Sequence, residues 1–293
     1  MKKGAFDKLR TEEKNKVLGG VLYLVATPIG NLADISERAL KVLSEVDFIA
    51  AEDTRNTMRM LTHFGISKPM VSYFEHNKAE RGAQIAERLE AGESCALVTD
   101  AGTPAISDPG EDLVRLCAER GIPVTSIPGA CAGICALTLS ALSTVRFCFE
   151  GFLPVKKSDR KKRLDILSRE ERTMILHEAP HKLRDTLDDL AKALGEGRRI
   201  ALCRELTKLN EEIMRVSIGE AVAYYKEHEP RGEYVLVIEG GELESTSADT
   251  TLTIEEQVEL YVGEGASKME AIKRVAKERG IPKNDVYKLF NND

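Results

Sequence analysis

Apolar runs of four to seven residues recur along the first half of the chain and predict a series of buried strands. The run Val21–Thr27 is almost continuously apolar, as expected of a strand covered on both faces of a parallel sheet. Four further runs have a similar character, Asp47–Ala51, Met70–Tyr73, Ser94–Thr99 and Pro123–Ile127. Because segments of helical periodicity separate them, the pattern predicts a doubly wound α/β sheet with right-handed crossovers.

The segments between these strands carry the signals that start and stop helices. Asp34 and Glu37 have the spacing of a capping box, which predicts a helix from there through Leu43. Further helices are predicted over Asn56–Phe64, Lys78–Glu90 and Glu111–Arg120. Ligands of such sheets bind at the carboxyl ends of the strands, so the loops that follow the strands should carry the chemistry.

A second lobe begins near Phe147, and its strands follow a less regular order. The predicted strands are Arg146–Glu150, Thr173–His177, Arg199–Arg204, Glu211–Ile218 and Glu233–Glu239. A helix is predicted over Pro180–Leu194, and the last three strands resemble a mixed sheet. We therefore predict a doubly wound domain over residues 21–145 and a second α/β domain with a mixed sheet over residues 146–241.

Polar segments flank these two domains. Residues 1–20 are mixed in charge and predict a flexible amino-terminal extension, and the polar run after Gly241 predicts a linker over residues 242–252. Residues 253–293 have the length and cap pattern of a tri-helical, helix-turn-helix-like tail. Ser267 and Glu270 cap its second helix, and Asn284 or Asp285 starts the third.

Composition narrows the class of protein. The 293 residues are 42% hydrophobic and 31% charged with a net charge of −6, which is typical of a globular protein and does not support a wholly electrostatic nucleic-acid binder. No apolar run approaches the roughly 18 residues of a membrane span. The six cysteines sit in apolar patterns without metal-ligand spacing, so we expect small buried hydrophobes, no metal and a reducing, cytoplasmic compartment.

The loop after the fourth strand, Asp100–Gly110, is the most informative segment of the chain. Two glycines and two prolines in eleven residues fix its backbone path, and Gly102 allows a ligand to approach the backbone closely. The N-terminus of the following helix should point back at this site. Neither a G-x-G-x-x-G nor a G-x-x-x-x-G-K-[ST] fingerprint is present, and no G-x-S-x-G elbow supplies a nucleophile.

Seven runs, in chain order, carry a resemblance to a known family. They are LYLVATPIGNLADISERAL, AEDTRNT, SYFEHN, VTDAGTPAISDPG, SIPGACAGICAL, ILHEAPHK and RGEYVLVIEG. Over residues 21–240 the chain resembles the ribosomal RNA methyltransferases of the tetrapyrrole-methylase-like superfamily. The resemblance implies two α/β lobes with a cofactor cleft between them, S-adenosylmethionine as the cofactor, and 2′-O-methylation of a cytidine in 16S rRNA of the small ribosomal subunit. It also implies a homodimer.

The resemblance further implies which residues face the cofactor. In the loop and in the turn before the next helix these are Ala101, Gly102, Thr103, Ile106, Ser107, Cys131 and Ala132. Pro28 would lie at the floor of the cleft, and Leu206 and Glu178, the latter through its backbone, would contribute from the second lobe. Thr103 stands where other branches of the superfamily carry an aspartate, which removes a charge beside the ligand.

A ribose 2′-hydroxyl is a poor nucleophile near neutral pH, so a nearby base would assist its methylation. The candidates follow the second and third strands: Glu52, Asp53 and Arg55 in one loop, and Glu75, His76 and Asn77 in the other. Any of the carboxylates or His76 could be the base, and Arg55 could hold a phosphate. The alternative is that these residues are strand-end caps and ion pairs.

Candidate RNA contacts lie mainly in the second lobe. Between Lys156 and Arg172 there are eight basic and four acidic residues, and this run includes Lys156, Lys157, Arg160 and Lys161. Phosphate contact and a solvated helix face are both open readings. Arg204 and Lys208 could also face RNA, whereas His177 and His181 are interpreted as structural histidines with satisfied rings. The tail could contact RNA, cap the lobe or assist dimerisation.

Two alternative functions remain open. One is a methylase of the same superfamily that acts on a small, tetrapyrrole-like ring. The other is a non-catalytic RNA-binding assembly factor that retains the fold and has no affinity for the cofactor.

Overall fold

The computed structural model describes residues 15–241, 252–279 and 281–290, which form two compact units. The first unit is Met1–Glu239 and the second is Gly240–Asp293. Most of the expected amino-terminal extension and of the linker, residues 1–14 and 242–251, lies outside the described residues. No described helix is both long enough and apolar enough to cross a bilayer.

The first sheet is a five-stranded parallel sheet in the order β3-β2-β4-β1-β5. Its strands are β1 (Leu22–Val25), β2 (Phe48–Ala51), β3 (Met70–Ser72), β4 (Cys95–Val98) and β5 (Val124–Ile127). The central strand β1 pairs Leu22 with Cys95 of β4 on one side and with Val124 of β5 on the other. The parallel α/β sheet predicted from the apolar runs is therefore confirmed.

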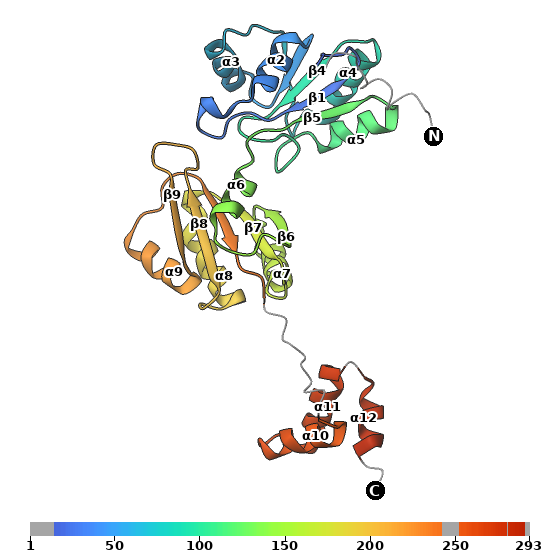
Figure 1. Ribbon diagram of the computed structural model, residues 1–293, viewed down its shortest axis with the longest axis vertical. Helices are drawn as coiled ribbons and strands as arrows, with labels where there is room; N and C mark the ends of the chain where they lie inside the picture. Colours follow the sequence, from blue (N-terminus) through green and yellow to red (C-terminus); the bar gives the residue numbers. More distant parts are fainter. Residues whose placement is uncertain (1–14, 242–251, 280, 291–293) are drawn as a thin grey trace. The chain divides into compact units, whose positions relative to one another are not determined.

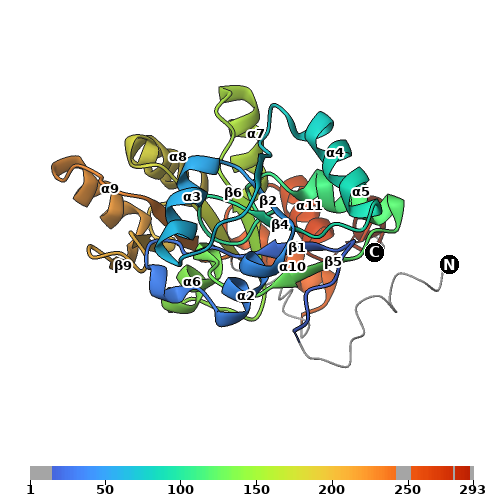
Figure 2. The ribbon, with the colours of Figure 1, turned by 90° about the horizontal axis from the view of Figure 1, so that it is seen from above.

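Two pairs of helices cover the two faces of this sheet (Figure 1). They are α2 (Glu37–Glu45) and α3 (Thr54–His63) on one face, and α4 (Lys78–Glu90) and α5 (Glu111–Arg120) on the other. Successive residues of β1 alternate between them, because Tyr23 packs in the first core and Leu22 in the second. Figure 2 shows α4 and α5 across the sheet from α2 and α3.

Two predicted helix starts are wrong by about two residues. The capping box at Asp34 does not form, because a short 3-10 helix (Leu32–Asp34) comes first and Ser36 caps α2 by accepting a hydrogen bond from the backbone of Ala39. Helix α3 begins at Thr54, since the carboxylate of Asp53 caps it. In both cases the helix begins directly after the residue whose side-chain oxygen accepts a hydrogen bond from the backbone of the first turn, which is Ser36 for α2 and Asp53 for α3.

The second sheet is mixed, as predicted, with the order β6-β7-β10-β8-β9. Its strands are β6 (Phe147–Gly151), β7 (Thr173–Glu178), β8 (Arg199–Arg204), β9 (Glu212–Ser217) and β10 (Tyr234–Ile238). One face packs against α7 (Lys157–Leu167), α8 (Leu183–Leu194) and α9 (Ile218–Glu227). Figure 1 shows these helices together beside the sheet.

Helix α6 (Ala132–Leu139) joins the two sheets. It follows β5 of the first sheet, yet its residues Ala136 and Leu137 pack with Ile175 of β7 and Val237 of β10 on the second. The start of α6 therefore lies where the carboxyl ends of the first sheet meet the second sheet.

The second unit has its own small core. Helices α10 (Ile254–Gly263), α11 (Lys268–Arg279) and α12 (Lys283–Phe290) bury Val258, Ile272, Val275 and Val286. Ser267 and Glu270 exchange hydrogen bonds at the start of α11, which confirms that predicted cap. The third helix begins at Lys283, directly after Pro282 and slightly earlier than predicted.

Candidate functional site

A cavity of about 490 Å³ lies at the carboxyl edge of the first sheet and is lined by residues of both sheets. Its volume is within the range of small-molecule sites. Nine of the ten residues that were expected to face a cofactor line it, namely Ala101, Gly102, Thr103, Ile106, Ser107, Cys131, Ala132, Glu178 and Leu206. The tenth, Pro28, does not line it, but its neighbour Ile29 does.

Hydrogen bonds hold the loop after β4 in place. The backbones of Thr27 and Gly102 exchange two hydrogen bonds, of 2.9 and 3.0 Å, which fasten the loop to the end of β1. The hydroxyl of Thr103 donates to the carbonyl of Ala130 at 2.9 Å, so the loop is also tied to the turn before α6. Gly102 has a φ of +89°, and a Cβ there would lie 3.3 Å from Ile29. The loop therefore presents a fixed backbone to the cavity.

Two cavity residues are each bracketed by left-handed residues that are not glycine. Ala105 and Ser107, with φ of 65° and 67°, flank Ile106, and Glu205 and Thr207, with φ of 50° and 66°, flank Leu206. Among the described residues, Asn15 and Ala141 are the only other non-glycine residues with a positive φ. Such backbone is costly and gathers at functional sites. Both loops therefore point to a ligand between them.

A different helix N-terminus from the expected one opens on the cavity. The lining ends at Asp108, so the start of α5 lies outside it, and its first turn carries the acidic Glu111 and Asp112 instead. Cys131, Ala132 and Gly133 line the cavity at the start of α6, where no side chain caps the backbone N–H groups. These donors suit an anionic group.

The carboxylate of Glu178 is directed into contacts with its own lobe. It accepts hydrogen bonds from the backbone of Ala179 at 2.9 Å and from the hydroxyl of Thr186 at 2.5 Å, and the residue is only 4% exposed. The side chain of Glu178 is thus engaged within the second lobe, and a cofactor contact through its backbone stays a prediction.

Three carboxylates gather around Thr99 at the first-lobe wall of the cavity. They belong to Glu52, Asp100 and Asp108, and all three line the cavity. The Thr99 hydroxyl donates to Glu52 at 2.8 Å. Burial raises the pKa of Asp108 to about 6, and the nearby charges of Glu52 and Asp100 act in the same direction, against a hydrogen bond with Thr99.

Asp108 was not among the acid–base candidates predicted from sequence. It stands near the end of a loop that was assigned to the cofactor, and a D-P-G turn gives no signal that its carboxylate is buried. Its neighbours Glu52 and Asp100 come from other strand ends, so only the folded chain brings the three together. A carboxylate with a pKa near 6 in a cavity is a candidate general base.

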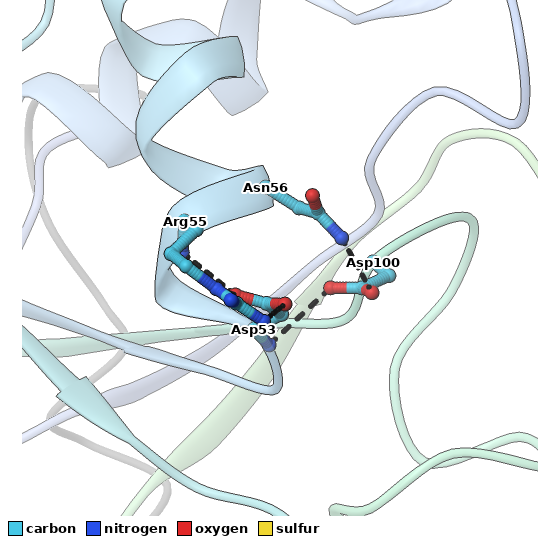
Figure 3. Close-up of polar contacts among 4 residues, drawn as sticks. All are labelled: Asp53, Arg55, Asn56 and Asp100. Atoms are coloured by element: carbon cyan, nitrogen blue, oxygen red, sulfur yellow. Dashed lines mark hydrogen bonds and ion pairs between the residues drawn. The ribbon is translucent and has the colours of Figure 1, made fainter.

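Asp53 and Arg55 do not line the cavity but pair with each other; Figure 3 shows this pair. The guanidinium of Arg55 donates to both oxygens of Asp53, at 3.1 and 2.8 Å, and holds the pKa of that carboxyl down at about 2. Asp100 accepts from the backbone of Asp53 and from the side-chain amide of Asn56, which ties this segment to the loop after β4. A carboxylate so engaged is a poor proton acceptor, whereas Arg55 remains 85% exposed.

The residues after β3 do not reach the cavity either. Asn77 supports its own turn, because its side chain accepts from the backbone of Phe74 and donates to the carbonyl of Ser72. Glu75 pairs with Lys78, and the ring of His76 meets the edge of Phe74. These contacts favour the alternative reading of strand-end caps and ion pairs for this loop.

The expected RNA contacts fall into two groups. Arg160 is bound to Asp189 and Thr186, and Arg204 to Glu212, so both guanidiniums already have partners. Lys208 lines the cavity but pairs with Glu205 and Glu233. The remaining lysines, Lys156, Lys157 and Lys161, are exposed on or beside α7. His181 is exposed as well, and His177, contrary to expectation, has a buried Nε2 atom without a hydrogen-bond partner.

The cysteines contribute two thiol side chains to the wall of the cavity, and the described residues form no metal site. All six cysteines are free thiols, and Cys131 and Cys203 line the cavity. Within residues 15–241, 252–279 and 281–290, no group of three His, Cys, Asp or Glu side chains is arranged to hold a metal ion.

Comparison with known proteins identifies close relatives over almost the whole chain. The family of tetrapyrrole (corrin/porphyrin) methylases matches residues 21–222. A protein of Synechocystis sp. named ribosomal RNA small subunit methyltransferase I is 46% identical over 270 residues, 92% of this chain and 97% of that protein. The protein of the same name from Bacillus subtilis is 45% identical, over 93% of this chain and 94% of the relative.

Solved structures share the fold at much lower identity. Uroporphyrin-III C-methyltransferase from Thermus thermophilus, complexed with S-adenyl homocysteine, is 16% identical and superposes with a TM-score of 0.53 over 74% of this chain and 96% of that one. A diphthine synthase gives a TM-score of 0.56 at 15% identity, over 75% and 89% of the two chains.

Proposed function

Since the chain belongs to the tetrapyrrole (corrin/porphyrin) methylase family, and to the group of relatives named ribosomal RNA small subunit methyltransferase I, we propose that it methylates rRNA of the small ribosomal subunit with S-adenosylmethionine as the donor. The target we propose is the ribose 2′-hydroxyl of a cytidine in 16S rRNA. The observation that carries the proposed rRNA methylation is the identity of 46% and 45% to these relatives over 97% and 94% of their length, whereas the cytidine target rests on the resemblance of the sequence motifs. Such a substrate would place the protein in the cytoplasm.

The cavity suits S-adenosylmethionine in size and in chemistry. Its volume of about 490 Å³ can receive a ligand of that size, and the left-handed loops around Ile106 and Leu206 present backbone groups to it. The uncapped start of α6 can receive the carboxylate of the methionine part, and the φ of +89° at Gly102 gives the loop a backbone path that other residues rarely adopt. When bound, this cofactor supplies a methyl group activated on a sulfonium.

The residues of the chain would then position the acceptor and take up its proton. We assign proton uptake to Asp108, with Glu52 and Thr99 as positioning residues that hold the carboxylate cluster in place. In-line transfer depends mostly on the alignment of the two reactants, which rigid loops on both sides of the cavity provide. The exposed guanidinium of Arg55 would bind a phosphate of the RNA backbone.

One experiment separates this function from its two alternatives. The purified chain is incubated with methyl-labelled S-adenosylmethionine and small subunits that lack the modification, and the position of the label is mapped. Label on a cytidine 2′-oxygen supports the proposal. Transfer only to a tetrapyrrole-like ring would instead support the small-molecule methylase. A chain that does not bind the cofactor at all would support a non-catalytic assembly factor.

We expect Arg55→Ala to weaken binding of the small subunit without loss of thermal stability. The Asp53–Arg55 pair is exposed, and such pairs contribute little to folding. Removing one phosphate contact should lower the slope of log affinity against log salt by about 1. Binding measured over a salt series tests this, with Arg59→Ala, an exposed residue one turn further along α3, as the control. A slope for Arg55→Ala equal to that of wild type would assign Arg55 to a structural pair only.

We also expect the tail to contribute to RNA binding through one face of α12. Lys283, Asn284, Tyr287 and Lys288 are all exposed, and their spacing places them side by side on the helix. Lysines, an amide and an aromatic ring suit a nucleic acid. The double variant Lys283→Ala/Lys288→Ala should lower the salt slope by about 2. The exposed Lys226→Ala on α9 is the control, and a slope equal to that of wild type would limit the tail to a structural role.

A homodimer is the oligomeric state we propose, as the resemblance of the chain implies. Sedimentation equilibrium measures it directly: a mass near twice 32.4 kDa is expected, and a mass of one chain at micromolar concentration would contradict it.

A further inference from the structure

Three rings form an aromatic cluster on the second-sheet wall of the cavity: Phe149, Phe152 and His177. The ring centre of His177 lies 5.2 Å from that of Phe149 and 5.6 Å from that of Phe152, with both pairs close to perpendicular. All three residues line the cavity. None of them has a part in the cofactor contacts or in the proton transfer proposed above.

A bulge in β6 brings the two phenylalanines to the same side of the sheet. In a regular strand, residues three positions apart point to opposite faces. The register between β6 and β7 shifts between Phe149 and Gly151, and Gly151 has a left-handed φ of 61°. Bulges of this kind redirect side chains beside active sites. Both rings can therefore meet His177.

His177 presents an unsatisfied polar atom in this cluster. Its Nε2 atom is buried and has no hydrogen-bond partner. Burial lowers the pKa of the imidazole, so the ring is neutral near pH 7 and offers either one donor or one acceptor at this atom. A buried polar atom without a partner is unfavourable in the free protein, and a ligand whose entry shifts the flanking rings of Phe149 and Phe152 would satisfy it with a polar group.

Both phenylalanines of the cluster are open to solvent. Phe152 is 59% exposed and Phe149 39% exposed, so a group that enters from solvent can stack on them. The cluster also adjoins the loop that carries Asp108, the proposed proton acceptor, because a Cβ on Gly151 would lie 3.4 Å from the hydroxyl oxygen of Ser107, the neighbour of Asp108. A nucleobase held by the aromatic cluster would therefore bring its ribose close to Asp108.

We propose that the aromatic cluster is the subsite for the pyrimidine base of the target nucleotide, in which Phe152 stacks on the base and Nε2 of His177 hydrogen-bonds to its polar edge. This inference rests on the proposed function, because it assigns the place of the acceptor in the same site. Stacking on an aromatic ring tolerates any base, whereas a hydrogen bond to the polar edge distinguishes cytosine from uracil. For the pyrimidine to leave the stacked bases of the RNA helix, its nucleotide would flip out of that helix and into the cavity.

Full-length variants test this subsite. Phe152→Ala should lower kcat/KM for unmodified small subunits about 10- to 100-fold, the range of lost base stacking. His177→Phe keeps a ring but not the nitrogen, so it should reduce the preference for subunits with cytidine over subunits with uridine at the target. Phe147→Leu is the control, because Phe147 is an exposed phenylalanine of the same strand that does not line the cavity. The dissociation constant for S-adenosylmethionine should stay within about twofold of wild type in all three.

The outcomes test the nucleobase subsite separately from the proposed rRNA methylation on which it rests. If Phe152→Ala and His177→Phe weaken S-adenosylmethionine binding as much as they lower transfer, the cluster holds the cofactor and the inference is overturned. Unchanged transfer and unchanged base preference in both variants would overturn it as well. Failure of the wild-type chain to label small subunits would overturn the proposed function itself, and the inference with it.

Discussion

Asp108→Asn is expected to lower methyl transfer to the small subunit about 100- to 10 000-fold, the contribution of a positioned general base. The side chain keeps its size and loses only its ability to take up a proton. Cofactor affinity should therefore stay close to wild type, and the loss should appear in kcat. Single-turnover transfer with labelled S-adenosylmethionine measures the effect, and Asp188→Asn, an exposed aspartate on α8, is the matched control.

The pH dependence gives a second test of the same carboxylate. Asp108 has to be ionised to accept a proton, and its pKa is raised to about 6. Wild-type kcat should therefore fall about tenfold per pH unit below 6 and level off above it. The remaining activity of Asp108→Asn should not show this decrease below pH 6. Full transfer by the variant, or a wild-type profile that is flat down to pH 5, would place the base elsewhere, with Glu52 next to be replaced.

Thermal stability separates a catalytic loss from a folding defect. A folded-state pKa above the value of the unfolded chain means that the protonated form of Asp108 stabilises the fold. This contribution is present at low pH and is lost as the pH rises through about 6. Asparagine is always neutral, so at pH 8 the variant should melt at the same temperature as wild type or higher. A lower melting temperature would show that the carboxylate supports the fold.

Gly102→Val is expected to weaken S-adenosylmethionine binding about 10- to 100-fold, as overpacking of a close-fitting site does. A side chain at this position would start 3.3 Å from Ile29, which also lines the cavity, so the loop or Ile29 would have to shift. Isothermal titration calorimetry measures the change.

The control for this variant has to reproduce its backbone strain. Gly195 has a φ of +91°, close to the +89° of Gly102, and a Cβ there would meet nothing within 4 Å. Gly195→Val should therefore lose a similar amount of stability and bind the cofactor as wild type does. Equal loss of binding in the two variants would show that strain, and not the shape of the cavity, explains the result.

The sequence predicts the sheets of this protein better than it predicts the acceptor side of the site. Apolar runs locate the three central strands of the first sheet, β1, β2 and β4, because these are buried on both faces, whereas the edge strands β3 and β5 are only partly buried. The loop after β4 is recognisable because glycine and proline fix local backbone geometry, and its residues do line the cavity. Both features depend on residues close together in the chain.

Burial of single polar groups depends on distant residues, and here the sequence gives little guidance. Asp108 and His177 look ordinary in their local context, and their neighbours in space come from other strands. Asp53 and Asn77 appear chemically promising, yet helix capping and turn support occupy them. A strand-end carboxylate can cap, pair or catalyse, and only its partners in the fold decide between these roles.

The position of α6 has a consequence for any attempt to dissect the enzyme. This helix follows the first sheet in the chain but buries Ala136 and Leu137 against the second. A recombinant fragment that ends at residue 145 would carry a helix with its apolar side uncovered and should aggregate, whereas one that ends near residue 130 would not. Natural exchange of the first lobe between relatives would face the same constraint. A functional recombination point should therefore lie at the start of α6 and not after it, where the chain enters the second lobe.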